Sequence, residues 1–94
     1  MAILNYHVTC SDVTAQRLVG SDNMPHDVVI HNATKSSNEY IWIGGSSATA
    51  GTADGMHIDQ ADTIYMTLRP GDELWCTSTP NGLIAHVVDI RRND

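Results

Sequence analysis

The stretch from Tyr40 to Cys76, YIWIGGSSATAGTADGMHIDQADTIYMTLRPGDELWC, decides which fold the chain adopts. It contains in order an apolar run, a loop of small residues, an alternating segment, a tight turn and a second apolar segment, at residues 40–43, 44–54, 63–69, 69–72 and 73–76. Alternation of apolar and polar residues is the period of a half-buried β-strand. The stretch therefore predicts strands joined by a loop and a tight turn, and it contains no recognisable catalytic constellation.

Turn residues separate the strands of this region. In Arg69-Pro70-Gly71-Asp72, proline sets the φ angle of the first central position, and glycine accepts the positive φ that a type II turn needs at the second. The segment Pro80-Asn81-Gly82 indicates another turn further along the chain. Both segments predict antiparallel neighbours, because tight turns reverse the direction of the chain.

The rest of the chain continues the same pattern of short strands and turns. We expect strands at residues 3–10, 14–19, 27–32, 40–43, 56–59, 63–69, 73–78 and 83–90. No segment carries apolar residues at helical spacing over two turns. About eight short strands at this spacing predict an all-β domain spanning residues 1–94, either a small antiparallel β-sandwich or a jelly-roll-like barrel.

Alternation also predicts which side chains share a face of each strand. One face of the first strand carries Leu4, Tyr6, Val8 and Cys10, and the sixth strand turns Ile64, Met66 and Leu68 inward. Ile84, Val88 and Ile90 share one face of the last strand, with His86 among them. The run at residues 40–43 differs, because its aromatic and isoleucine side chains make both of its faces apolar. Such a strand is buried on two sides or offers one face to another molecule.

Charge and composition exclude several classes of partner. The formal net charge is −6, and no Lys or Arg occurs between residues 36 and 68. Nucleic acid is therefore not expected as a partner, because phosphate binding depends on clustered Lys and Arg. No run approaches the ~18 apolar residues that span a membrane, and the first ten residues lack the basic and apolar regions of a signal peptide. We expect synthesis in the cytosol, with Cys10 and Cys76 as buried reduced thiols.

Five histidines raise the question of a metal site, at residues 7, 26, 31, 57 and 86. A structural zinc site needs about four converging ligands, whereas His26 and His31 are an odd number of residues apart and point to opposite faces of a strand. His57 and Asp59 share a face and are the best remaining pair.

The Gly-rich segment after residue 43 lacks the lysine and the helix of a phosphate-binding loop. Asp54, Asp59 and Asp62 lack the spacing of an EF-hand. We therefore expect no cofactor, no metal and no enzymatic activity.

Six segments of the chain together form a pattern: Val28 to Asn32, Tyr40 to Ser46, Ala48 to Gly55, Leu68 to Asp72, Leu74-Trp75 and His86 to Val88. These segments resemble a pattern found in small all-β virion proteins of tailed bacteriophages. They match a β-branched strand before an Asn turn, a "YIGGS"-like strand end, a Thr/Ser/Gly loop, a Pro-Gly-Asp turn, an aromatic strand and a closing strand. The resemblance covers about residues 17 to 90 and consists of turn chemistry and alternation.

The resemblance implies a capsid decoration (cement) protein, or a related head or tail accessory protein. Its partners would be the major capsid protein and further copies of itself, in a small oligomer such as a trimer, on the capsid surface. Aromatic side chains anchor interfaces disproportionately, so Tyr40, Trp42 and Trp75 are the candidate partner-binding residues, although they could instead complete the core. Ile3 and Leu4 belong to an N-terminal segment that could order on the shell.

Two other functions remain open at this point. A tail or fibre module that binds a cell-surface glycan would stack Trp42 or Trp75 on sugar rings, beside polar residues such as Asn38 and Asp54. A small β-barrel enzyme or metal protein would use His57, Asp59 and His86. The first differs from a cement protein in binding glycans, and the second in holding a stoichiometric transition metal.

Overall fold

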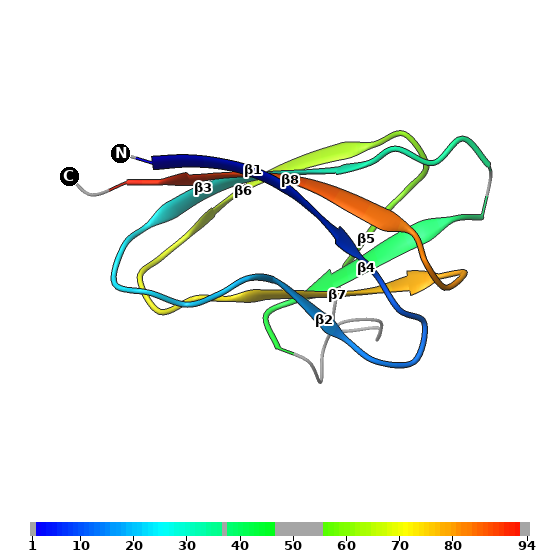
Figure 1. Cartoon of the computed structure of the whole chain (residues 1–94), viewed down its shortest axis with the longest axis horizontal. Coiled ribbons are helices and arrows are strands. Elements are labelled where there is room, and N and C mark those ends of the chain that lie inside the picture. The colour runs from blue at the N-terminus through cyan, green and yellow to red at the C-terminus, as the bar shows by residue number, and fades with distance from the viewer. Residues whose placement is uncertain (1, 37, 47–55, 93–94) are drawn as a thin grey trace.

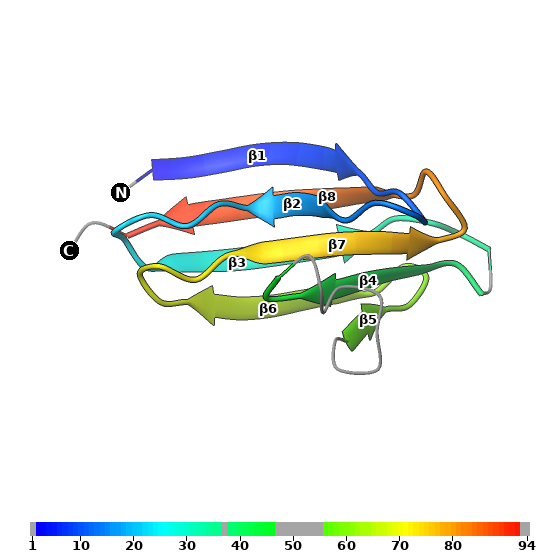
Figure 2. The same cartoon turned by 90° about the horizontal axis from the view of Figure 1, so that it is seen from below.

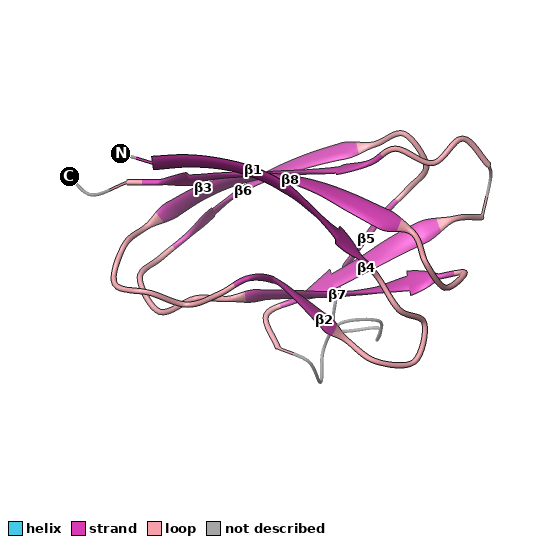
Figure 3. Ribbon diagram, in the orientation of Figure 1, coloured by secondary structure: helices cyan, strands magenta, loops and turns pink. Residues whose placement is uncertain are grey.

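A computed structural model describes residues 2–36, 38–46 and 56–92 of the 94-residue chain. Eight strands succeed one another along it (Figure 1): β1 (Ala2–Thr9), β2 (Gln16–Val19), β3 (His26–Asn32), β4 (Tyr40–Gly44), β5 (Met56–Ile58), β6 (Thr63–Leu68), β7 (Leu74–Thr79) and β8 (Ile84–Arg91). Each begins and ends within two residues of its expected bounds. Among these residues the structure contains strands and loops only (Figure 3), and no helix long and apolar enough to cross a membrane occurs there.

The strands form two four-stranded antiparallel sheets that lie one over the other (Figures 1 and 2). The first sheet has the order β1-β8-β3-β6, and the second has the order β2-β7-β4-β5. The first strand pairs with the last, the second with the seventh, the third with the sixth and the fourth with the fifth. This nested pairing is the jelly-roll arrangement of a β-sandwich, so the predicted fold class is confirmed.

The core lies between the inner faces of the two sheets. Isoleucines fill its centre: Ile30 of β3, Ile41 and Ile43 of β4 and Ile58 of β5 are all buried. Each such side chain contributes roughly 1.5–3 kcal/mol when it leaves water. β3 shows why the segment is a strand, because buried and half-buried residues alternate along all seven positions, and β-branched residues favour the extended backbone.

The predicted turns have the expected geometry. Gly71 has a φ of +90°, and the backbone N–H of Asp72 donates to the carbonyl oxygen of Arg69 at 3.0 Å, which closes the turn between β6 and β7. Gly82 also has a φ of +90° in the turn between β7 and β8. A side chain at either position would be strained, because only glycine adopts this φ freely.

The last strand, β8, does not bury the face that carries its larger apolar side chains. Ala85, Val87 and Asp89 point into the core, whereas Ile84, Val88 and Ile90, which share the other face, point outward. The outward face of β8 is therefore the one with the larger apolar side chains. The first sheet consequently exposes apolar surface on its outer side, with Ile3, Tyr65 and Ile84 among the exposed residues.

Candidate functional site

The outer face of the second sheet carries the candidate aromatic residues. Because successive side chains in a strand point to opposite faces, Ile41 and Ile43 fill the core while Tyr40 and Trp42 face outward from β4. β7 follows the same rule, with Leu74 and Cys76 buried and Trp75 half-buried on the outer face. All three aromatic residues are half-buried, so they form part of the surface and not of the core.

Tyr40, Trp42 and His57 form a group that we name the aromatic cluster. Trp42 lies directly opposite His57 of β5, and their ring centroids are 4.8 Å apart. The Tyr40 ring lies 5.0 Å from that of His57 and 6.1 Å from that of Trp42, both in edge-to-face orientations. These separations fall within the range in which aromatic rings attract one another. His57 therefore belongs to the site, although the sequence singled it out only as a metal ligand.

Polar groups fix each ring of the aromatic cluster. The indole N–H of Trp42 donates to Thr79 Oγ1 at 3.2 Å, and the Tyr40 hydroxyl donates to Asn38 Oδ1 at 3.2 Å. His57 Nδ1 lies 2.8 Å from Asp59 Oδ1, so the predicted shared face of these two residues is confirmed. The cluster is thus pre-ordered before any partner arrives, which lowers the entropy cost of binding.

Trp75 lies on the same face, beyond the aromatic cluster. It is opposite Gly44 on one side and Arg17 of β2 on the other. Its indole N–H donates to Glu73 Oε1 at 2.9 Å. Trp42, in contrast, is opposite Thr77, so the two tryptophans are offset by two residues along the strands. The structure therefore brings all three predicted aromatic residues to one face of the second sheet.

A hollow of about 210 Å³ adjoins the aromatic cluster. It is lined by Asn38, Tyr40, Asp59 and Gln60, so one aromatic ring and three polar side chains face the same space. Asp54, another polar residue considered for this role, lies outside the described residues. The hollow combines hydrogen-bonding groups with an aromatic wall, the combination that small polar ligands require.

The buried amide of Asn32 holds the two ends of the site together. Its Nδ2 donates to the carbonyl oxygens of Glu39, just before Tyr40, and of Ile58, just after His57, at 3.1 and 3.0 Å. Its Oδ1 accepts the backbone N–H of Thr34 at 3.3 Å. The side chain is fully enclosed, so water does not compete for these hydrogen bonds. Because the bonded carbonyls adjoin Tyr40 and His57, Asn32 is a positioning residue for the aromatic cluster.

Ile3 and Leu4 lie away from the aromatic cluster, Ile3 on the outer face of the first sheet and Leu4, opposite Asp89, on its inner face. Both belong to β1, at the edge of the first sheet, and they are 58% and 37% exposed. Beside them, the outer face of the first sheet carries a row of three imidazoles, His7, His86 and His31, in directly opposite positions. The ring centroids of neighbouring pairs are 6.0 and 6.5 Å apart. The sequence could not place these histidines together, because their contact depends on strand pairing.

His57, Asp59 and His86 do not converge, since His57 is on the second sheet and His86 faces outward from the first. Among the described residues, no three His, Cys, Asp or Glu side chains form a group that could hold a metal ion. His26 and His31 point to opposite faces of β3, as predicted: His26 is enclosed, and His31 Nδ1 lies 2.7 Å from Thr63 Oγ1.

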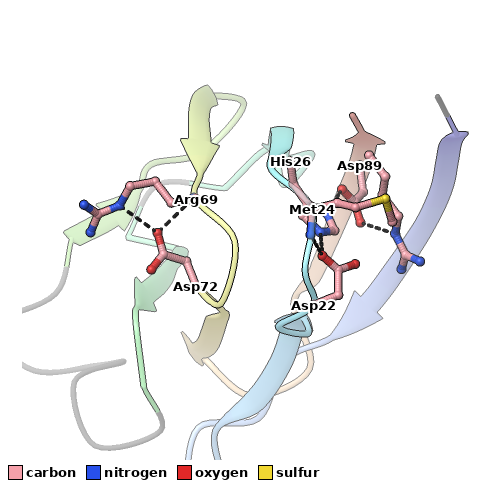
Figure 4. Close-up of polar contacts among 7 residues, drawn as sticks. Asp22, Met24, His26, Arg69, Asp72 and Asp89 are labelled. Atoms are coloured by element: carbon pink, nitrogen blue, oxygen red, sulfur yellow. Dashed lines mark hydrogen bonds and ion pairs between the residues drawn. The ribbon is translucent and has the colours of Figure 1, made fainter. Parts of the chain in front are cut away.

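His26 belongs to a buried ionic network beneath the first sheet (Figure 4). Its Nδ1 lies 2.6 Å from Asp89 Oδ1, and its Nε2 lies 2.8 Å from Asp22 Oδ1. Arg91 Nε also reaches Asp89, at 3.5 Å. Burial lowers the pKa of His26, but the hydrogen bonds to the two carboxylates raise it by more, so the net pKa lies above the ordinary 6.5. The bond from His26 in turn lowers the pKa of the Asp22 carboxyl.

No protein-family model matches the chain, and no curated protein or solved structure is similar to it at a significant level.

Proposed function

We propose that this protein is a capsid decoration (cement) protein of a tailed bacteriophage, made in the host cytoplasm, which binds the assembled lattice of the major capsid protein and stabilises the head. The observation that supports it best is the outward, pre-ordered aromatic cluster of Tyr40, Trp42 and His57. Apolar and aromatic side chains that gather on an exposed face mark interaction sites. The phage-like motifs of the sequence support the same role.

The physical demands of this role agree with the surface. A flat aromatic face suits a protein partner, because ordered Trp and Tyr side chains lose little conformational entropy on binding and anchor interfaces strongly. One such face alone offers too little contact area for tight binding by a single copy. Many copies, or a multimer that engages several lattice sites, raise the overall affinity without new contacts. Protein bound only to the assembled shell stabilises that shell by mass action.

Binding to the shell is expected to depend on Trp42. In co-sedimentation with assembled shells of the major capsid protein of its phage, Trp42→Ala should weaken binding roughly 30-fold, the effect of losing a hot-spot residue of about 2 kcal/mol. Tyr65→Ala is the matched control, because Tyr65 is an aromatic residue on the outer face of the other sheet, 78% exposed. Equal binding by wild type and Trp42→Ala, or loss in the Tyr65 variant alone, would refute this assignment of the surface.

Self-association is the second part of the proposal, and β1 is the surface that supports it. This edge strand contains no Lys, Arg or Pro, the residues that usually protect an edge from pairing with another chain. We expect a small symmetric oligomer by light scattering, and a shift to monomer in Ile3→Lys. Val13→Lys, at an exposed position outside the strands, should leave the mass unchanged. A wild-type protein that is monomeric at all concentrations tested would contradict this part.

A glycan-binding module is the alternative function, favoured by the hollow beside the aromatic cluster. Sugar rings stack on aromatic faces while their hydroxyls bind polar side chains, and here Asn38, Asp59 and Gln60 line the hollow next to Tyr40. The variant Gln60→Ala distinguishes the two functions. If the protein binds glycans, this substitution should abolish binding on a glycan array, whereas binding to shells should stay at the wild-type level. Glycan binding together with no affinity for shells would favour the alternative over the cement role.

A further inference from the structure

Cys10 and Cys76 are the two cysteines of the chain, and the fold brings them into contact. They are 66 residues apart in sequence, yet their sulfur atoms are 2.9 Å apart. Both side chains are enclosed, with 1% and 0% of their surfaces exposed. Packing alone does not require the two thiols of the chain to touch, because another small apolar side chain could fill the space of either one.

The backbone holds both cysteines in place. Cys10 directly follows β1; its N–H donates to the carbonyl oxygen of Leu83 at 2.7 Å, and its own carbonyl accepts the N–H of Gly82 at 2.9 Å. Cys76 lies in β7, between Gln16 of β2 and Ile43 of β4. The thiol pair therefore joins the end of the first sheet's edge strand to a central strand of the second sheet.

We propose that Cys10 and Cys76 are a modification site that closes an intramolecular disulfide between the two sheets when the protein meets a small-molecule disulfide oxidant such as oxidised glutathione. The sulfur atoms must approach by about 0.9 Å to reach the roughly 2.05 Å of a disulfide bond. Both cysteines are anchored by neighbouring strands, so this bond links elements that are already adjacent. The inference does not depend on the proposed function.

The two thiols have unequal roles. The two sulfur atoms share a hydrogen bond, which lowers the pKa of Cys10 more than burial raises it. The same bond, together with burial, raises the pKa of Cys76. Cys10 is therefore the sulfur that ionises first and attacks the oxidant, since the thiolate is the nucleophile.

The reaction is a pair of thiol–disulfide exchanges. The Cys10 thiolate attacks one sulfur of oxidised glutathione, which forms a mixed disulfide and releases one glutathione that takes up the proton lost by Cys10. Cys76 loses its proton and attacks the Cys10 sulfur, which forms the protein disulfide and releases the second glutathione with that proton. Two protein thiols are oxidised and one glutathione disulfide is reduced to two thiols. Because both thiols are enclosed, exchange requires local opening or occurs during folding.

The disulfide stabilises the protein chiefly by restricting the unfolded chain. It closes a loop between residues 10 and 76, and long closed loops remove more freedom from the unfolded state than short ones. We expect the melting temperature of the oxidised protein to exceed that of the reduced protein by roughly 10 °C or more. The pair should stay reduced in a reducing cytosol and oxidise outside it.

The test uses the full chain, refolded in oxidising and in reducing glutathione buffers. Intact mass should show the loss of two hydrogens in the oxidising buffer, no alkylation of either cysteine after denaturation, and a higher melting temperature that returns to the reduced value on addition of dithiothreitol. In Cys10→Ser and in Cys76→Ser, the melting temperature should not depend on the buffer.

Three results would overturn the proposal. They are two alkylatable thiols after refolding in the oxidising buffer, a stable adduct carrying one glutathione, and disulfide-linked dimers on a non-reducing gel. Oxidation without a rise in melting temperature would overturn the stabilising effect. Because the wild type is compared with itself, this test holds even if a serine variant fails to fold.

Discussion

Asp89→Ala is expected to lower the free energy of unfolding by about 3–5 kcal/mol, the usual effect of removing one partner of a buried ion pair. Asp89 is completely enclosed, and its carboxylate accepts from His26 at 2.6 Å and from Arg91 at 3.5 Å. Its removal leaves the enclosed His26 with a single carboxylate partner, Asp22. The loss is a large part of the roughly 5–15 kcal/mol that stabilises a domain, and urea denaturation measures it.

The matched control is Arg69→Ala. Arg69 and Asp72 form an ion pair in the turn between β6 and β7 (Figure 4), but the Arg69 side chain is 87% exposed. Exposed pairs contribute only about 0–1 kcal/mol, because water and salt screen the charges and the side chains lose entropy. If Asp89→Ala costs no more than Arg69→Ala, the buried network does not stabilise the fold. Asp89→Asn keeps the shape and serves if the alanine variant does not fold.

The same network contributes to how stability varies with pH. The pKa of His26 is raised in the folded protein, so its contribution is fully present below about pH 6.5 and is lost as the pH rises through the folded pKa. The pKa of Asp22 is lowered, so its contribution is present above about pH 4 and is lost as the pH falls through the folded value. Wild-type protein should therefore lose stability above pH 6.5, and Asp89→Ala should show a weaker loss.

Asn32→Asp is expected to cost about 2–6 kcal/mol, even though the two side chains have nearly the same shape. The amide of Asn32 donates two hydrogen bonds, to the carbonyl oxygens of Glu39 and Ile58. A carboxylate cannot donate, so both carbonyls lose their donor and face a negative oxygen in an enclosed site. An unsatisfied buried polar group costs about 1–3 kcal/mol, and the free energy of unfolding in urea measures the sum.

This substitution should also disturb the aromatic cluster, because the two carbonyls flank Tyr40 and His57. The near-ultraviolet circular dichroism of the folded variant should therefore weaken, and shell binding should fall with it. Asn23→Asp is the control: it makes the same chemical change at an exposed position outside the strands and should alter neither quantity. Equal effects of the two substitutions would show that the Asn32 amide has no positioning role.

Part of the candidate site could be predicted from the sequence. Alternation in the run at residues 40–43 separates its aromatic residues from its isoleucines, and the structure places Tyr40 and Trp42 on the outer face while Ile41 and Ile43 enter the core. His57 could not be assigned to the same group, because its contact with Trp42 depends on the pairing of β4 with β5. The positioning role of Asn32 was equally hidden, since its bonds reach residues 7 and 26 positions away.

By itself, the sequence determined the all-β class, the number of strands, their bounds to within two residues and the turn at Pro70-Gly71. These properties are local, because strand alternation and turn chemistry depend on neighbouring residues. Only the tertiary structure decided which face of β8 is covered, and which distant residues meet, as with His26 and Asp89 or the two thiols. The reason is physical: a strand offers two equivalent faces until another sheet packs on one of them, and the energy of that choice comes from the whole core.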